Sequence, residues 1–198
     1  MPTYSAECGM MKHGVLSEAF EDLFPSRPPK GISVLSRKGG LLREVDVILK
    51  MIKGEDVIIG TGHLSPAESL LLVERARELG VKKILVTHPS SFLINMSLDQ
   101  QKRAVNMGAY IEHCYVGCTP FTSTGSPIPS KILADHIREV GAERCIMSTD
   151  FGQTKNLTPT EGMRKFVEEM LENGITESEI CWMIKGNPRK LLNLDQPS

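Results

Sequence analysis

The sequence predicts an α/β fold in which a parallel sheet is covered by helices. From about residue 41 onward, short apolar runs of strand length alternate with longer amphipathic segments. Most of the amphipathic segments begin with a helix-capping motif. Three apolar runs, at residues 57–63, 84–88 and 145–150, end on a histidine or an aspartate. In a parallel sheet the carboxyl ends of the strands meet at one edge, so these polar residues are expected to lie together.

The expected elements follow one another in a single domain spanning 1–198, with an irregular segment at 1–40 and strand–helix units at 41–194. In chain order they are a strand stub at 1–4, a long loop at 5–30, a short strand at 31–35, helix 41–53, strand 56–61, helix 66–79, strand 82–87, helix 98–107, strand 109–115, helix 130–140, strand 143–149, and helices 159–173, 177–185 and 188–193.

The helix ends justify these boundaries. A capping box places a serine or threonine hydroxyl three residues before a glutamate or glutamine. Such boxes occur at Ser65/Glu68, Ser97/Gln100, Thr158/Glu161 and Thr176/Glu179. Glycines that suit a left-handed helix end stand at Gly80, Gly108, Gly141 and Gly174.

The composition is that of an ordinary soluble domain, with 40% hydrophobic residues. The 23 basic and 24 acidic side chains nearly balance, and no basic stripe with interleaved aromatics is present, so nucleic acid is not an expected partner. All apolar runs are far shorter than the roughly 20 residues that span a bilayer. With no signal layout at the start of the chain, we expect a cytoplasmic protein.

The cysteines fit a reducing compartment better than a disulfide framework, because they number five and include no CxxC pair. The run His113-Cys114-x-x-x-Cys118 has some of the residues of a zinc site. No second ligand pair follows at a suitable spacing, so buried thiols are the favoured interpretation.

Three histidines occupy equivalent positions. His63, His88 and His113 are separated by steps of 25 residues, and each lies at or near the end of an apolar strand. A lone histidine at such a place is more often structural, but three of them followed by Asp150 favour a shared site. Imidazole suits zinc, iron, nickel and manganese, and a carboxylate beside it either binds the metal or accepts a proton. The alternative for Asp150 is a helix cap or a loop-stabilising side chain.

Neighbouring residues of a strand point to opposite faces, so only one of Glu112 and His113 can face the common site. We expect His113 there, because Ile111 and Ala109 share its face, and we expect Glu112 to meet the surrounding helices. Two other histidines carry weaker cases. His136 lies in the middle of a helix and is expected at the surface; His13 lies in a loop, exposed or in contact with substrate.

Four short runs resemble the amidohydrolase superfamily, and more narrowly a poorly characterised branch of amidohydrolase-like metal-dependent proteins. They are Gly-Thr-Gly-His-Leu-Ser at 60–65, Val-Thr-His-Pro at 86–89, Ser-Thr-Asp at 148–150 and Gly-Asn-Pro-Arg-Lys-Leu-Leu at 186–192. The resemblance covers about residues 31–194. It implies a (β/α)8 TIM barrel in which His63, His88 and Asp150 belong to the metal site at strands five, six and eight, with His113 on strand seven.

The sequence departs from that family at one point, because no His-x-His pair of the kind carried by strand one occurs in the chain. If residues 1–4 are the end of strand four, the chain is a partial TIM barrel, approximately strands 4 or 5 to 8 with their helices. Its open edges and inner face would then need cover. A second copy of the chain or a separately supplied N-terminal half would provide it; a marginally stable remnant is the other possibility.

The resemblance implies a metal-dependent hydrolase that acts on a small amide, lactone or other ester-like molecule, provided that the His-x-His half is supplied. His63, His88 and Asp150 would serve a divalent metal, zinc first and iron, nickel or manganese as alternatives. Asp150 would take a proton from water and pass it to the leaving group. His113 would orient the substrate or stabilise negative charge. The alternatives are a non-catalytic, truncated or degenerate domain and a metal-dependent phosphoesterase. Loops 89–97 and 116–129 would set the substrate.

Overall fold

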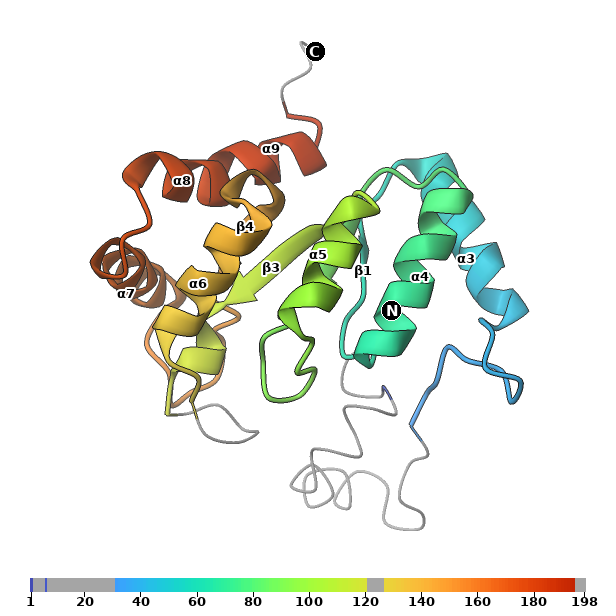
Figure 1. The fold of residues 1–198 in the computed structure, drawn as a ribbon, viewed down its shortest axis with the longest axis horizontal. Coiled ribbons are helices and arrows are strands. Elements are labelled where there is room, and N and C mark those ends of the chain that lie inside the picture. Colours follow the sequence, from blue (N-terminus) through green and yellow to red (C-terminus); the bar gives the residue numbers. More distant parts are fainter. Residues whose placement is uncertain (2–5, 7–30, 121–126, 195–198) are drawn as a thin grey trace.

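A parallel four-stranded sheet forms the centre of the structure, and its strands lie side by side in chain order (Figure 1). The strands are β1 (Ile59–Gly60), β2 (Ile84–Thr87), β3 (Tyr110–Cys114) and β4 (Cys145–Ser148). The structure is a computed structural model that describes residues 1, 6, 31–120 and 127–194. Helices alternate with the strands, so the predicted α/β architecture is confirmed.

Each predicted helix after residue 41 is present, with ends that shift by a few residues. The helices are α3 (Arg43–Glu55), α4 (Pro66–Glu78), α5 (Leu98–Asn106), α6 (Ser130–Val140), α7 (Pro159–Glu172), α8 (Glu177–Cys181) and α9 (Asn187–Leu191). Between α8 and α9 the chain widens into a π-helical turn, η3 (Trp182–Gly186), where one continuous helix to residue 185 was expected. Short 3-10 turns, η1 (Tyr115–Cys118) and η2 (Ala142–Arg144), flank β3 and β4.

The helix-capping predictions are confirmed in atomic detail. All four capping boxes form, with the hydroxyl accepting a backbone N–H and the glutamate or glutamine accepting the N–H of the cap residue. The four glycines that follow helices all adopt positive φ angles, between 81° and 97°. These local signals therefore mark the starts of α4, α5, α7 and α8 and the ends of α4, α5, α6 and α7.

The expected strand at 31–35 does not form a regular strand. Ile32 makes one isolated bridge with Ala6, and Leu35 makes one with Leu41. A tight turn at Gly39 folds this segment back on itself, so that the Leu42 N–H donates to the Val34 carbonyl at 2.9 Å. The predicted strand stub at 1–4 and loop at 5–30 lie outside the described residues, apart from Met1 and Ala6.

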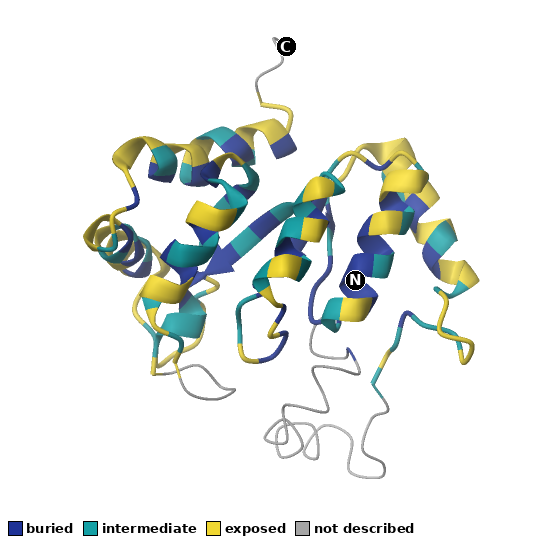
Figure 2. Ribbon diagram, viewed as in Figure 1, coloured by how far each residue is buried: buried dark blue, intermediate teal, exposed yellow. Residues whose placement is uncertain are grey.

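The two faces of the sheet are buried to different degrees. One face is packed into the hydrophobic core beneath α4, α5 and α6, which lie in front of the strands in Figure 1; we call it the helix-covered face, and its residues include Ile84, Val86, Ile111, Cys145 and Met147. The other, here named the open face, carries the half-buried side chains Leu85, Thr87, Tyr110, Glu112, Ile146 and Ser148. Figure 2 shows buried and exposed residues on different sides of the covering helices.

Helix α9 is attached to the beginning of β4 through a buried side chain. The Asn187 amide donates to the carbonyls of Ala142 and Cys145, at 2.8 and 2.7 Å. Among the described residues no helix is long and apolar enough to cross a membrane.

Candidate functional site

Two buried histidines meet at the carboxyl edge of the sheet. His63 follows β1 and His88 follows β2 directly; they are 9% and 8% exposed. Their Nε2 atoms lie 3.0 Å apart and their ring centroids 4.8 Å apart. The structure thus brings together the two residues that the 25-residue spacing placed at equivalent strand ends.

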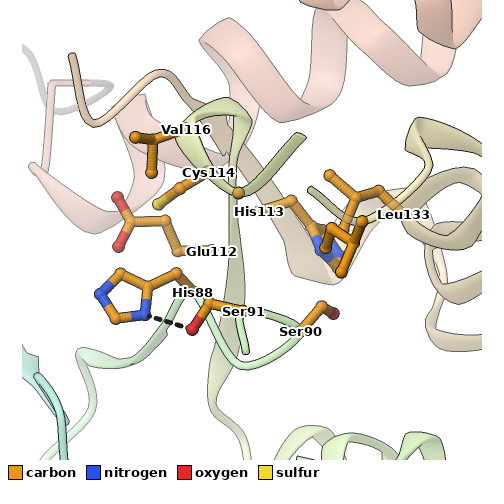
Figure 3. Close-up of a pocket in the computed structure, with 10 residues that line it drawn as sticks. His88, Ser90, Ser91, Glu112, His113, Cys114, Val116 and Leu133 are labelled. Carbon is orange, nitrogen blue, oxygen red and sulfur yellow. Dashed lines mark hydrogen bonds between the residues drawn. The ribbon is translucent and has the colours of Figure 1, made fainter. Parts of the chain in front are cut away.

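The backbone holds both histidines in unusual positions. Gly62 has a φ of 61° immediately before His63, and His88 itself has a φ of 30°. A positive φ on a residue with a side chain costs of order 1–3 kcal/mol and is typical of functional sites. Ser91 lies at the other side of the His88 ring, with its Oγ 3.4 Å from Nδ1, which directs Nε2 toward His63 (Figure 3).

Asp150 lies just beyond β4, also with a positive φ, of 55°. Partial burial raises the pKa of the Asp150 carboxyl, whereas the charge of His63 lowers it. The Asp150 carboxyl and the His63 ring are therefore within electrostatic reach of each other. The interpretation of Asp150 as a helix cap is wrong, because Thr158 caps α7. Gln153 bonds the backbone carbonyl of Asp150 rather than its carboxyl. The Asp150 side chain is exposed at the end of β4.

The expectation that His113 shares this site edge is wrong. Its register partner in β4 is Met147, and both lie on the helix-covered face. Figure 3 shows the His113 ring beside Leu133 of α6, on the opposite side of β3 from Glu112 and His88. His113 is 1% exposed, and burial is the main reason that its pKa falls to about 3, so its imidazole is neutral. The face that Ala109 and Ile111 share with it is the one packed under the helices.

Glu112 takes the place that was expected for His113. It lies on the open face and accepts a hydrogen bond from Ser148 Oγ at 3.0 Å. Burial raises the pKa of its carboxyl, and the nearby charge of Asp150 raises it further. Cys114 adjoins the same group, with its Sγ 3.2 Å from Ser148 Oγ. The sequence signal for Glu112 was the polar residues at matching register positions, Thr87 on β2 and Ser148 near it on β4.

A small pocket opens between the ends of β2 and β3 (Figure 3). Its lining includes His88, Ser90, Glu112, His113 and Leu133. None of the described residues that line it is a lysine or an arginine. Both ring nitrogens of His113 are buried there without a hydrogen-bond partner among the described residues.

Among the described residues, the remaining histidine and cysteines do not join the site. His136 is half-buried rather than at the surface, with Nδ1 3.0 Å from Ser90 Oγ and 3.2 Å from Gln101 Nε2. His13 and Cys8 lie outside the described residues. Cys118 and Cys145 are free thiols whose pKa values are raised by burial. Nothing in the described part of the chain joins His113, Cys114 and Cys118 into a metal-binding group.

The chemistry of the histidine pair fits a divalent metal. Two nitrogen ligands each lie about 2.0–2.1 Å from zinc, so neighbouring ligands of one ion are roughly 3 Å apart. The two Nε2 atoms, which are 3.0 Å apart and within hydrogen-bond distance of each other, have a separation close to this value. Within residues 31–120 and 127–194, no three His, Cys, Asp or Glu side chains are arranged to hold a metal. His63 and His88 are two side chains of a type that binds metals, and Asp150 is within electrostatic reach of His63 without completing a set of three.

Comparison with known families gives one match. A family model described as a family of unknown function, DUF6282, matches residues 1–112, which is more than half of the chain. The matched segment contains His63, His88 and Glu112 and ends before Asp150. No curated protein matches the sequence.

Proposed function

The chain belongs to the DUF6282 family of unknown function, and from the geometry of its own site we propose that it is a metal-dependent hydrolase of small amide, lactone or other ester-like substrates. The observation that carries the proposal is the buried pair His63 and His88, with Nε2 atoms 3.0 Å apart at the carboxyl edge of a parallel sheet. The carboxyl group of Glu112 lines the same pocket as His88, and that of Asp150 is within electrostatic reach of His63.

The same proposal includes the finer description of the fold, a partial (β/α)8 barrel of amidohydrolase type. In it β1 to β4 correspond to strands five to eight, and the open face corresponds to the barrel interior. Three facts support this assignment. The first two are that the strands follow one another in chain order and that helices cover one face. A third is that the Met1 amino group donates to the Gly60 carbonyl at 3.2 Å, which puts the start of the chain beside β1.

His63 and His88 would hold the metal through their neutral imidazole nitrogens. Zinc is the first expectation, with iron, nickel and manganese as alternatives. When bound, such an ion supplies Lewis-acid polarisation of the scissile carbonyl and activation of water. The protein's contribution is to hold the two rings in register, which the Ser91 contact to His88 and the positive φ angles at the strand ends accomplish.

Asp150 would act as the proton carrier. It is solvent-exposed at the rim of the site, where water and substrate arrive, and its raised pKa brings it closer to the range in which a carboxyl both accepts and returns a proton. Its carboxylate would accept a proton from the attacking water and deliver it to the leaving group. His113 lies beneath the opposite face and is no longer proposed to touch substrate.

A substrate panel with and without metal tests this function. Activated amides, lactones and phosphate esters are assayed with the full chain after addition of zinc, iron, nickel or manganese. The proposal predicts metal-dependent hydrolysis of amides or lactones that is lost in His88→Ala, with the circular dichroism spectrum retained. Hydrolysis of phosphate esters alone would favour the phosphoesterase alternative. Metal binding without any turnover would favour a non-catalytic domain, which the absence of a His-x-His pair also supports.

A further inference from the structure

We propose that Glu112 selects the substrate of this site, favouring molecules that present an N–H or ammonium group and rejecting phosphate esters and other anions. The inference rests on the proposed hydrolase function, and it narrows the substrate class within it. Glu112 lines the same pocket as His88. It has neither the metal-binding role proposed for His63 and His88 nor the proton-transfer role proposed for Asp150.

The position of Glu112 suits contact with a bound molecule. Its side chain lies on the open face of β3 and, in Figure 3, on the same side of that strand as the His88 ring. Ser148 Oγ donates to Oε1 at 3.0 Å and so fixes the orientation of the carboxyl group. Among the described residues no hydrogen bond is made to Oε2. The second oxygen is therefore available to accept a donor from a substrate.

The charge around Glu112 is negative. Asp150 is near enough to raise the pKa of the Glu112 carboxyl, and the charges of both groups add to the effect of burial in raising the pKa of the Cys114 thiol. No lysine or arginine is found among the described residues that line the pocket. Proteins that bind phosphate usually supply arginine, lysine or a helix N-terminus for it. Two carboxylates without such a group repel an anion and attract a cation or an N–H donor.

His113 lines the same small pocket but lies on the opposite side of β3 from Glu112. It is 1% exposed, and both of its ring nitrogens are without a partner among the described residues. Buried polar atoms are nearly always hydrogen-bonded. A buried water beside His113 would supply a partner there, so His113 is not part of the contact between Glu112 and a substrate.

The test uses four chromogenic probes that differ in charge. Glycine para-nitroanilide is cationic, para-nitroacetanilide is neutral, succinyl para-nitroanilide is anionic, and para-nitrophenyl phosphate carries a phosphate. We expect kcat/KM to be at least tenfold higher for the cationic than for the anionic anilide. Glu112→Gln should bring this ratio close to one, mainly through KM, while Glu112→Asp should keep its direction. The control is Glu74→Gln, an exposed carboxylate on α4 whose loss should leave the ratio unchanged.

A binding measurement separates this inference from the proposed function. Calorimetric titration of the full chain with glycinamide, acetamide, succinamate and inorganic phosphate requires no turnover. Tighter binding of glycinamide that is lost in Glu112→Gln supports the selection by Glu112, even if no anilide is hydrolysed and the hydrolase proposal fails. A preference for succinamate or phosphate, binding that Glu112→Gln leaves unchanged, or no binding of glycinamide at all would overturn it.

Discussion

His113 is a neutral imidazole buried among apolar side chains on the helix-covered face of β3. Burial lowers its pKa from the usual 6.5 to about 3, because a charged ring loses its hydration there. In the unfolded chain the same residue titrates near its usual value. Protonation below pH 6.5 therefore favours the unfolded state, and the folded state loses stability as the pH falls toward 3.

Replacing this residue should make the protein less sensitive to acid. We expect His113→Leu to be at least as stable as wild type at pH 7.5, because it removes two buried nitrogens that lack partners among the described residues. Below pH 6.5 the advantage of the variant should grow by about 1 kcal/mol per pH unit. Urea unfolding at pH 7.5, 6 and 5 measures the difference in unfolding free energy between the variant and wild type. Parallel stability curves for the two proteins would contradict the assigned pKa shift.

The chemical and the structural contributions of Asp150 can be tested separately. Its φ of 55° is a conformation that asparagine tolerates well. Its raised folded pKa means that ionisation costs stability as the pH rises, and asparagine does not ionise. We therefore expect Asp150→Asn to melt within about 3 °C of wild type or above it, while turnover falls about a hundredfold or more. A variant that unfolds, or that keeps full turnover, would refute the role in proton transfer.

At the scale of elements, the start of α4 is tied to more of the molecule than the other helix starts are. Glu68 is only 5% exposed. Its carboxylate accepts hydrogen bonds from Ser65 N and Oγ at 3.0 and 2.7 Å, and also from Ser33 Oγ and Val34 N at 3.0 and 3.4 Å. This capping box therefore anchors both the helix that follows His63 and the segment at 31–35.

The buried capping box at Glu68 and an exposed capping box at Glu161 provide a matched comparison. Glu161 at the start of α7 makes the same bonds to Thr158 but is exposed, and it binds no second segment in the described part of the chain. We expect Glu161→Ala to cost about 1 kcal/mol of unfolding free energy and Glu68→Ala about 3 kcal/mol, because buried donors lose a charged acceptor. Denaturant titration of both variants measures the difference. Equal costs would show that the contacts at 33–34 add nothing.

The helices of this protein are predictable from sequence because their ends are marked locally. A hydroxyl, an acidic side chain three residues later and a glycine after the last turn act within a few residues of one another. Strand ends depend on pairing with a neighbour that is distant in sequence, so β1 is confined to Ile59–Gly60 where 56–61 was expected. The segment at 31–35 has the residues of a strand but is folded back by the turn at Gly39.

The site was predictable only in part, for a related reason. The regular spacing of His63 and His88 reflects one repeated strand–helix unit, and the structure does bring these residues together. The choice between Glu112 and His113 required knowledge of which sheet face the helices cover. Alternation gives the two faces but does not tell them apart when both carry apolar residues, as Leu85 and Ile146 do on the open face.

At the scale of the whole molecule, the described sheet has apolar side chains left half-buried on its open face. Exposed apolar residues also lie along α3, at Val47, Ile48 and Met51. Contiguous exposed apolar surface is typical of interaction sites. Association of two copies of the chain therefore remains our prediction. Sedimentation analysis over a hundredfold range of concentration should detect a dimer; a monomer throughout that range would contradict self-association.

The most direct test of the central claim is the metal content of the purified full chain, measured by elemental analysis after dialysis. We predict about one zinc, iron, nickel or manganese ion per chain, lost in His63→Ala and in His88→Ala. His136→Ala should keep it, because that histidine bonds Ser90 and Gln101 away from the pair. A chain that binds no metal after incubation with each ion, or a His63→Ala variant that binds as tightly as wild type, would contradict the metal site.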